Sequence, residues 1–282
     1  MTILSKSLIL NNLKLKIKDV DNTLADPHNI STYHKIPILD GLELLNAKKH
    51  NIDFPFHTHC TFNIALILNQ TFYTKLNDKF LQAPIGTLSI TNPHEVHATP
   101  CDNKLGNSFF TFYVAPDVLK TLNKGRDVFF EDKIIYDRDL VNRFHYLSEQ
   151  FKNPALNLEK ELLNVLEKLV SRYASSMYFS DKKTILFQDF IGKNLMEKFS
   201  LTDAAKHFGL DKYKFLRLFK HETGLTPNNY ILLQRIEKCK KLLTKETDLM
   251  EVAIETGFYD VAHLSRHFKR FTGVTPSEYK RA

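Results

Sequence analysis

The chain repeats one segment near its C-terminus, and this repeat limits what that part of the molecule can fold into. The first copy contains Leu201-Thr-Asp-Ala-Ala205-Lys-His-Phe-Gly209, Phe219-Lys220 and Thr223-Gly-Leu-Thr-Pro-Asn-Asn-Tyr230. The second copy contains Leu249-Met-Glu-Val-Ala253-Ile-Glu-Thr-Gly257, Phe268-Lys269 and Thr272-Gly-Val-Thr-Pro-Ser-Glu-Tyr279. The segments that end at Gly209 and Gly257 lie 48 residues apart, whereas the segments that begin at Phe219 and Phe268 lie 49 apart. One residue is therefore inserted after Gly257. One structural unit is therefore used at two places.

Each copy has the pattern of two short helices joined by a tight turn. Gly209 and Gly257 are expected to end the first helix, because glycine adopts the left-handed conformation found there. Asp211 and Asp260 stand where an N-cap would bind free amides of the second helix. Apolar residues four positions apart give that helix one buried face: Phe215 with Phe219, and Leu264 with Phe268. This pattern is typical of a helix-turn-helix unit, whose second helix enters the major groove of DNA.

The opposite face of each second helix is predicted to contact DNA. Its residues are Lys212, Tyr213, Leu216, Arg217 and Lys220 in the first copy, and Val261, Ala262, Ser265, Arg266 and Lys269 in the second. Arg217 and Arg266 are expected to contact bases or phosphates, since arginine can hold guanine through two hydrogen bonds. Leu216, Val261 and Ala262 are candidates for contact with thymine methyl groups, and a packing role is the alternative for Leu216.

A helix is predicted between the copies, over residues 227–244, because Pro227 suits a first helical turn and apolar residues alternate with charges after it. Its length of about 27 Å could hold two recognition helices roughly one DNA turn, about 34 Å, apart. The charge supports a DNA partner. Residues 181–282 carry 19 basic and 13 acidic residues, whereas residues 1–180 carry 20 and 19. A basic domain attracts phosphate.

The repeated motifs resemble the DNA-binding domain of the AraC/XylS family of bacterial transcription regulators, over residues of about 184–281. The resemblance covers about a third of the chain and implies a regulator that binds double-stranded promoter DNA. Activation through contact with RNA polymerase is the usual mode in that family, and repression is compatible with the same residues. His263 and Leu264 stand where the family often carries an aromatic pair, and Val261 and Ala262 stand where small polar residues are usual. These departures concern the base preference of the second helix and not its fold.

The rest of the chain is long enough for a second domain, since 282 residues indicate about two. Short strand-like runs separated by Asn, Asp, Pro and Gly lie between residues 36 and 114, which favours a sandwich or jelly-roll barrel. Within it, Phe56-His57-Thr-His59, Pro84-Ile-Gly86 and Pro93-His94-Glu95-Val-His97 resemble the two half-motifs of the cupin barrel. That barrel is also the effector-binding domain common at the front of AraC-type regulators.

The barrel is predicted to hold a small effector. Strand alternation puts His57, His59 and Asn63 on one face, and Glu95 and His97 together on another. If both faces line the barrel, three imidazoles converge, and a polar effector pocket is the favoured interpretation. No cofactor is assigned. A divalent metal on the three histidines is an alternative, although the glutamate of metal-binding cupins is missing after the His pair, and purely structural histidines are another.

Two helices are predicted after the barrel, over residues 139–152 and 157–178. An apolar stripe in the second contains Leu158, Leu162, Val165 and Leu169. This stripe is predicted to form a homodimer surface, as the resemblance implies, and packing on the chain's own barrel is the alternative. The predicted divisions are an effector-binding domain over 1–136, a helical segment over 137–180 with a linker at 179–184, and a DNA-binding domain over 181–282.

The predicted fold class is therefore α+β in two domains, and the predicted function is an effector-controlled transcription regulator, expected to be an activator and not an enzyme. No apolar run approaches the length of a membrane span, and the apolar run near Met1 is too short for a signal peptide, so a cytoplasmic location is expected. Cys60, Cys101 and Cys239 have no metal or disulfide spacing, and Cys60 and Cys101 are expected to be small buried residues. The alternative functions are a cupin-type metal-dependent enzyme and a non-specific architectural DNA-binding protein.

Overall fold

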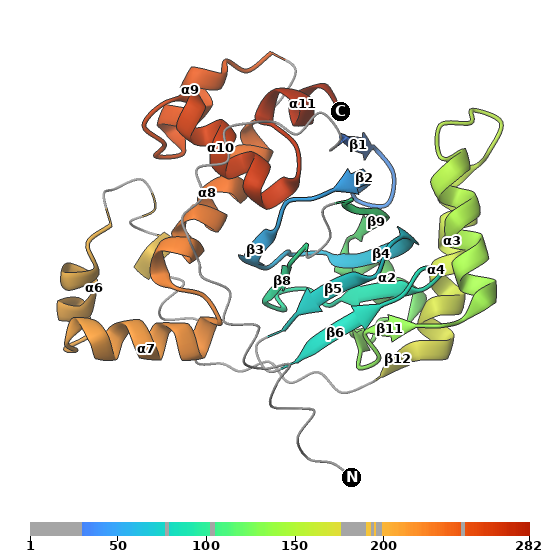
Figure 1. The fold of residues 1–282 in the computed structure, drawn as a ribbon, viewed down its shortest axis with the longest axis horizontal. Helices are drawn as coiled ribbons and strands as arrows, with labels where there is room; N and C mark the ends of the chain where they lie inside the picture. Colours follow the sequence, from blue (N-terminus) through green and yellow to red (C-terminus); the bar gives the residue numbers. More distant parts are fainter. Residues whose placement is uncertain are drawn as a thin grey trace, which may run out of the picture.

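The computed structural model describes residues 30–76, 79–101, 105–175, 190–192, 195, 199–243 and 246–282. A β-rich part, residues 30–175, is followed by an all-α part, residues 199–282 (Figure 1). This confirms the predicted two-domain α+β architecture. The predicted linker at 179–184 lies outside the described residues, and the predicted domain boundaries stay predictions.

The β-rich part is a sandwich of two antiparallel sheets. The larger sheet has the order β1 (Ile30–Ile36), β2 (Leu42–His50), β9 (Asn107–Val114), β4 (Phe62–Asn69), β7 (Leu88–Thr91) and β11 (Ile134–Ile135). The smaller sheet has the order β3 (Phe54–His57), β8 (His97–Thr99), β5 (Phe72–Lys75) and β6 (Phe80–Ala83), and β10 (Phe129–Phe130) pairs with β12 (Ala174–Ser175). Among the described strands the sheets stay separate, so the predicted barrel is an open sandwich of jelly-roll type.

The central strands β4 and β9 are buried on both faces of the larger sheet. Successive side chains of a strand point to opposite faces, so each of these strands contributes to two cores. Ile64 and Phe112 lie in the core on the outer face of the larger sheet. The next residues along the two strands, Ala65 and Tyr113, belong to the core on the inner face, toward the smaller sheet. These strands therefore read as continuous apolar runs, and the inner face leaves room for a site between the sheets.

Helices cover the outer face: α2 (Pro116–Leu122), α3 (Arg138–Gln150) and α4 (Leu158–Tyr173). The Asp137 carboxylate caps α3 by accepting hydrogen bonds from the amides of Asp139 and Leu140, at 3.0 and 3.1 Å. Arg172 of α4 donates to Asp137 at 2.7 Å and to Asp139 at 3.1 Å. These contacts fix the two helices against each other. Both end earlier than predicted, and α4 gives way to β12 at Ala174.

The apolar stripe of α4 packs on its own domain. Leu162, Val165 and Leu169 are at most 3% exposed and share the outer core with Phe112. Leu158 is half-buried against the same core. The prediction that these four residues form a dimer surface is therefore corrected, and the alternative interpretation explains the stripe. The outer face of the sheet needs an apolar cover, and α4 provides it.

The all-α part contains the two predicted helix pairs and the helix between them. Its elements are α6 (Leu201–His207), α7 (Lys212–Thr223), α8 (Pro227–Leu242), α9 (Leu249–Glu255), α10 (Val261–Thr272) and α11 (Pro276–Arg281). Gly209 and Gly257 have φ of 65° and 76°, the left-handed conformation predicted for them. The Asp211 carboxylate caps α7 and the Asp260 carboxylate caps α10, each by accepting hydrogen bonds from backbone amides. The inserted residue lengthens the turn after Gly257, as predicted.

The helix α8 connects the two pairs. It begins at Pro227 after the Thr226 cap and ends at Leu242, two residues before the predicted end. The Arg235 guanidinium of α8 donates to the carbonyl oxygens of Gly257 at 2.6 Å and Leu195 at 3.0 Å. This arginine therefore ties α8 to the turn of the second pair.

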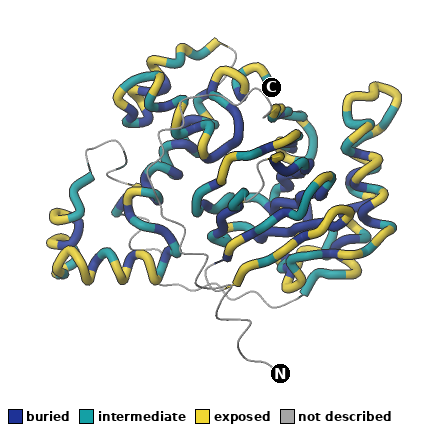
Figure 2. Tube along the Cα trace, in the orientation of Figure 1, coloured by how far each residue is buried: buried dark blue, intermediate teal, exposed yellow. Residues whose placement is uncertain are grey.

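The second helix pair packs on the sandwich together with the connecting helix α8 and the C-terminal helix α11. Helices α8 and α10 contact β3, and α11 contacts β1 (Figure 1). Figure 2 shows that burial concentrates in the strands and at this contact, whereas α6 and α7 expose much of their surface. Gly273 follows α10 with φ of 82°, and a Cβ atom there would lie 3.3 Å from the Phe54 ring. The glycine therefore lets the end of α10 approach β3.

A buried threonine closes the second helix of each pair, α7 and α10. The Thr223 hydroxyl donates to the Phe219 carbonyl at 2.7 Å and accepts from the Leu225 amide at 3.2 Å. Thr272 makes the corresponding contacts with Phe268 at 2.8 Å and Val274 at 3.4 Å. Each hydroxyl thus satisfies backbone groups where the helix ends.

We expect Thr223→Val and Thr272→Val each to lower the free energy of unfolding by about 1–3 kcal/mol, because valine has the same shape and leaves buried backbone groups unpaired. Urea unfolding of the full chain would measure this. Thr202→Val, at an exposed position of α6, is the control and should change stability little. Equal stability of all three variants would show that these hydroxyls do not hold the helix ends.

Candidate functional site

A cavity of about 40 Å³ lies between the two sheets, beneath α10. Its wall is formed mainly by inward-facing strand residues, namely Leu45, Phe54, His57, His59, Asn63, Ala65, Phe72, Thr74, Ser89, Thr91, His97, Thr99, Phe109, Thr111, Tyr113 and Phe271. Its polar groups are imidazoles, hydroxyls and one amide. The described wall contains no carboxylate and no ammonium group.

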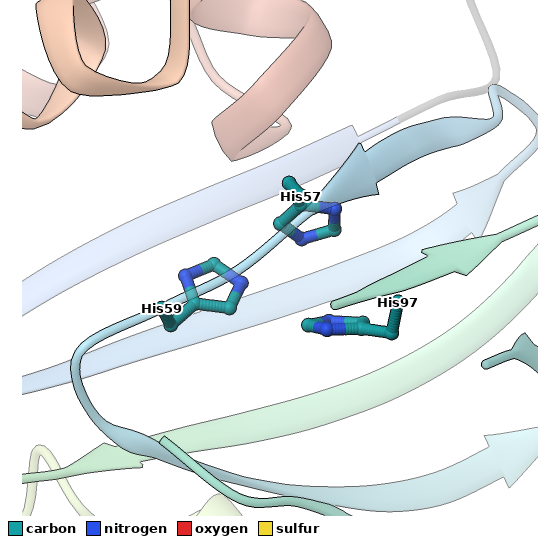
Figure 3. A group of neighbouring side chains, drawn as sticks. All are labelled: His57, His59 and His97. Atoms are coloured by element: carbon teal, nitrogen blue, oxygen red, sulfur yellow. The ribbon is translucent and has the colours of Figure 1, made fainter. Parts of the chain in front are cut away.

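The three predicted histidines converge in this cavity. His57 ends β3 and pairs with His97 of β8, and His59 follows in the loop before β4. The ring centroids are 4.3 Å apart for His57 and His97, 4.7 Å for His57 and His59, and 5.5 Å for His59 and His97. One ring nitrogen of each lies within 4.8 Å of the others. Figure 3 shows the three rings gathered around one space.

Backbone carbonyls set the tautomers of two of these rings. Nδ1 of His57 lies 2.6 Å from the Pro55 carbonyl oxygen, and Nδ1 of His97 lies 3.0 Å from that of Glu95. A carbonyl oxygen only accepts hydrogen bonds, so we assign the hydrogen to Nδ1 in both rings. In this tautomer the lone pair of each ring lies on Nε2. Two of the three imidazoles are therefore prepared to accept a hydrogen bond or bind an ion.

Burial also decides the charge of the cluster. Burial lowers the pKa of His57 and His59 well below 6.5, and the neighbouring imidazoles lower it further. The pKa of His97 is lowered as well, again mainly by burial. The three rings are therefore uncharged at neutral pH.

Asn63 lines the cavity as predicted, but Glu95 does not. The Glu95 carboxylate accepts hydrogen bonds from Lys133 Nζ at 2.8 Å and from the Asn92 amide at 3.0 Å, outside the cavity. Strand alternation misplaced it because β8 begins only at His97, and the preceding His94 has a positive φ of 63°. Glu95 instead positions His97 through its backbone carbonyl.

One wall residue comes from the all-α part. Phe271, near the end of α10, is 4% exposed and its ring centroid lies 6.4 Å from that of His57. The copies are 49 residues apart here, so the corresponding residue of the first pair is Glu222. A phenylalanine in place of a glutamate gives the second recognition helix an apolar contact with the cavity. Phe271 was not among the residues predicted for the site, although this difference between the two copies marks it in the sequence.

A second contact between the two parts is polar. The Glu43 carboxylate of β2 accepts hydrogen bonds from the hydroxyls of Tyr33 and Tyr279, both at 2.5 Å, and lies 3.6 Å from Lys240 Nζ of α8. Burial alone would raise the pKa of Glu43, but Lys240 and the two hydroxyls hold that pKa below its usual value. The carboxylate is therefore charged at neutral pH and links β2 to α8 and α11. No sequence motif marked it.

The predicted DNA-contact residues all lie outside the core. Tyr213 is 65% exposed, and Lys212, Arg217 and Lys220 of α7 are exposed with it. On α10, Ala262 and Arg266 are exposed, whereas the side chains of intermediate exposure are Val261, Ser265 and Lys269, together with Leu216 of α7. Phe215, Phe219, Leu264 and Phe268 occupy the opposite, buried face. Each recognition helix therefore presents its predicted face to solvent. Cys60, expected to be buried, is exposed.

Comparison with protein families matches both parts. Residues 41–174 match the AraC-like ligand binding domain, and residues 204–282 match a helix-turn-helix domain. Regulator YbfI of Bacillus subtilis is 28% identical over 226 residues, which is 75% of this chain and 81% of YbfI. The transposon Tn10 TetD protein of Escherichia coli is 39% identical over 93 residues, 32% of this chain and 67% of TetD. Activator AarP of Providencia stuartii is 32% identical over 88 residues, 31% of this chain and 65% of AarP.

The whole arrangement also occurs in a solved structure. Apo ToxT from Vibrio cholerae superposes with a TM-score of 0.53 at 12% identity, over 91% of this chain and 98% of ToxT, which shows a shared fold. None of the described helices has the length and apolar character to cross a membrane. With a ligand-binding sandwich in front of two helix-turn-helix units, this chain belongs to the AraC/XylS family of transcription regulators.

Proposed function

We propose that this regulator binds promoter DNA through the exposed faces of α7 and α10, and that a small effector in the histidine cavity controls this binding. One observation carries the proposal: Phe271 belongs both to a recognition helix and to the cavity wall. An effector that changes the wall must change the packing of Phe271. The position of α10 relative to α7 then depends on what the cavity holds.

The thermodynamic requirement is a difference in effector affinity between two arrangements of the parts. In one of them, the docked arrangement, α8, α10 and α11 pack on the sandwich as in this structure. It is stabilised by Phe271 in the cavity wall and by the Glu43 cluster, which consists of Glu43, Tyr33, Tyr279 and Lys240. An effector that favours or opposes these contacts changes the population in which both recognition helices can occupy successive major grooves. No series of intermediate residues is needed to couple the cavity to α10, because the Phe271 side chain belongs to both.

The finer assignments follow the family. We propose an activator that contacts RNA polymerase in the cytoplasm, acts as a homodimer and catalyses no reaction. The relative AarP is named a transcriptional activator, which supports activation rather than repression. The stripe of α4 is buried, so residues outside it make the dimer contact.

We expect Arg217→Ala and Arg266→Ala each to weaken specific DNA binding by about 1–3 kcal/mol, and to relax base preference at different half-sites, because each arginine contacts its own major groove. Fluorescence anisotropy with DNA fragments selected by the wild-type protein would measure this. Arg138→Ala removes an exposed arginine of α3 and is the matched control. A loss that is equal on selected and random DNA would assign the arginines to phosphate contacts.

We expect Phe271→Ala to change DNA affinity several-fold and to speed amide hydrogen exchange in β3 and β8, because it removes part of the cavity wall and its packing on β3. Leu218→Ala, which shortens a partly exposed side chain of α7, is the control and should leave exchange in the strands unchanged. Unchanged exchange in β3 and β8 of Phe271→Ala would contradict the coupling between cavity and helix.

A further inference from the structure

We propose that the cavity is a binding site for a divalent transition-metal ion of zinc type, held by ring nitrogens of His57, His59 and His97. The inference rests on the proposed function, because it names the chemical class of the effector for the same cavity. The ion would complete its coordination with water, since three protein ligands leave a position open.

The convergence of the rings is the first argument. His57 and His59 come from the β3 end and its loop, and His97 comes from β8, some 40 residues later in the chain. The fold brings a ring nitrogen of each within 4.8 Å of the others. His57 and His97 are buried and His59 is half-buried. Apolar side chains would pack such a space at a lower desolvation cost than polar rings. A shared ligand accounts for their meeting.

The orientation of the rings is the second argument. Histidine ligands usually donate their other ring N–H to a carbonyl or carboxylate, which fixes the ring and strengthens the free nitrogen as a ligand. His57 and His97 have this arrangement, with Nδ1 on the Pro55 and Glu95 carbonyls, which leaves the lone pair of each ring on Nε2. Both rings therefore have the outer hydrogen bond of a metal ligand before any ion arrives.

The size and chemistry of the wall select the class of ligand. One water molecule needs roughly 10–15 Å³ of cavity volume. The cavity of about 40 Å³ therefore holds an ion with one or two waters rather than a larger effector. Hydroxyls of Thr74, Ser89, Thr91, Thr99 and Thr111 surround the histidines and can bind such waters. Magnesium and calcium require carboxylate or carbonyl oxygens, whereas neutral imidazoles suit zinc. The described residues of the wall include no carboxylate, so the wall favours zinc over magnesium and calcium.

The geometry also connects the ion to α10. Bonds of about 2.0–2.1 Å in a tetrahedral site place ligand nitrogens about 3.3 Å apart. The rings are now separated by up to 4.8 Å between these atoms, so binding must draw them together. His57 lies in the wall beside Phe271, at 6.4 Å between ring centroids. Contraction of the cluster therefore acts on the contact that docks the second recognition helix.

The test uses the full chain, freed of metal with a chelator. Calorimetry with zinc chloride should give one site per chain, cobalt should give the absorption spectrum of a tetrahedral site, and magnesium chloride should not bind. His57→Ala and the milder His59→Asn should each weaken zinc binding by more than the roughly 10–100-fold typical of losing an outer hydrogen bond. Circular dichroism would confirm that the variants are folded.

Two histidine controls make the test specific. His94→Asn changes an exposed histidine outside the cavity at a positive φ that asparagine tolerates, and should bind zinc like the wild type. His263→Asn disrupts the second close pair, His263 and His267 on α10, and should also retain the site. Absence of zinc binding, or binding lost in His263→Asn but kept in His59→Asn, would overturn the metal site.

DNA binding separates this inference from the proposed function. Zinc should change the affinity of the wild type for selected DNA at least several-fold and leave His59→Asn unaffected. Zinc binding at the histidines without any change in DNA affinity would overturn the role of the ion as effector. Failure of DNA binding in every form of the folded protein would instead contradict the proposed function, while calorimetry would still decide the metal site.

Discussion

The packing of the second helix pair on the sandwich is the contact on which the rest of the structure depends. One apolar core runs from the inner face of the larger sheet, through Phe54 and Phe109, to Phe268 of α10. Because burial of apolar surface is the main favourable term in folding, a shared core couples the two parts more firmly than surface contacts would. The cavity lined by the three histidines lies within this core. Anything that enters the cavity therefore acts on the contact between the parts.

The two copies of the repeat have diverged at this contact. Both keep the caps, the left-handed glycines and the buried threonines that build a helix pair. The copies differ where Phe271 stands in place of Glu222, and Tyr279, unlike Tyr230, binds Glu43. The second pair thus gains an apolar and a polar contact with the sandwich that the corresponding residues of the first pair do not make. The two copies of one unit therefore share their internal structure and differ in what they pack against.

The Glu43 cluster adds specificity to the apolar contact. A buried carboxylate is costly unless its partners are in place, so the docked arrangement is stable only with Tyr33, Tyr279 and Lys240 correctly positioned. Apolar surfaces tolerate sliding, whereas these bonds have defined directions. The cluster therefore selects one position of α8 and α11 on the sandwich.

The convergence of the three histidines was expected only if both strand faces line one barrel, and local signals in the sequence were enough to determine the repeat, its turns and caps, and the β character of the front part. Each depends on residues near one another in the chain, or on the alternation of a strand. Alternation failed for Glu95 because the strand begins after it, and the stripe of α4 was ambiguous because an amphipathic helix looks the same whichever surface it covers. Tertiary structure alone decided that Phe271 enters the cavity and that Glu43 meets Tyr279, 236 residues away. Such contacts depend on how the two domains dock, and no local pattern encodes that geometry.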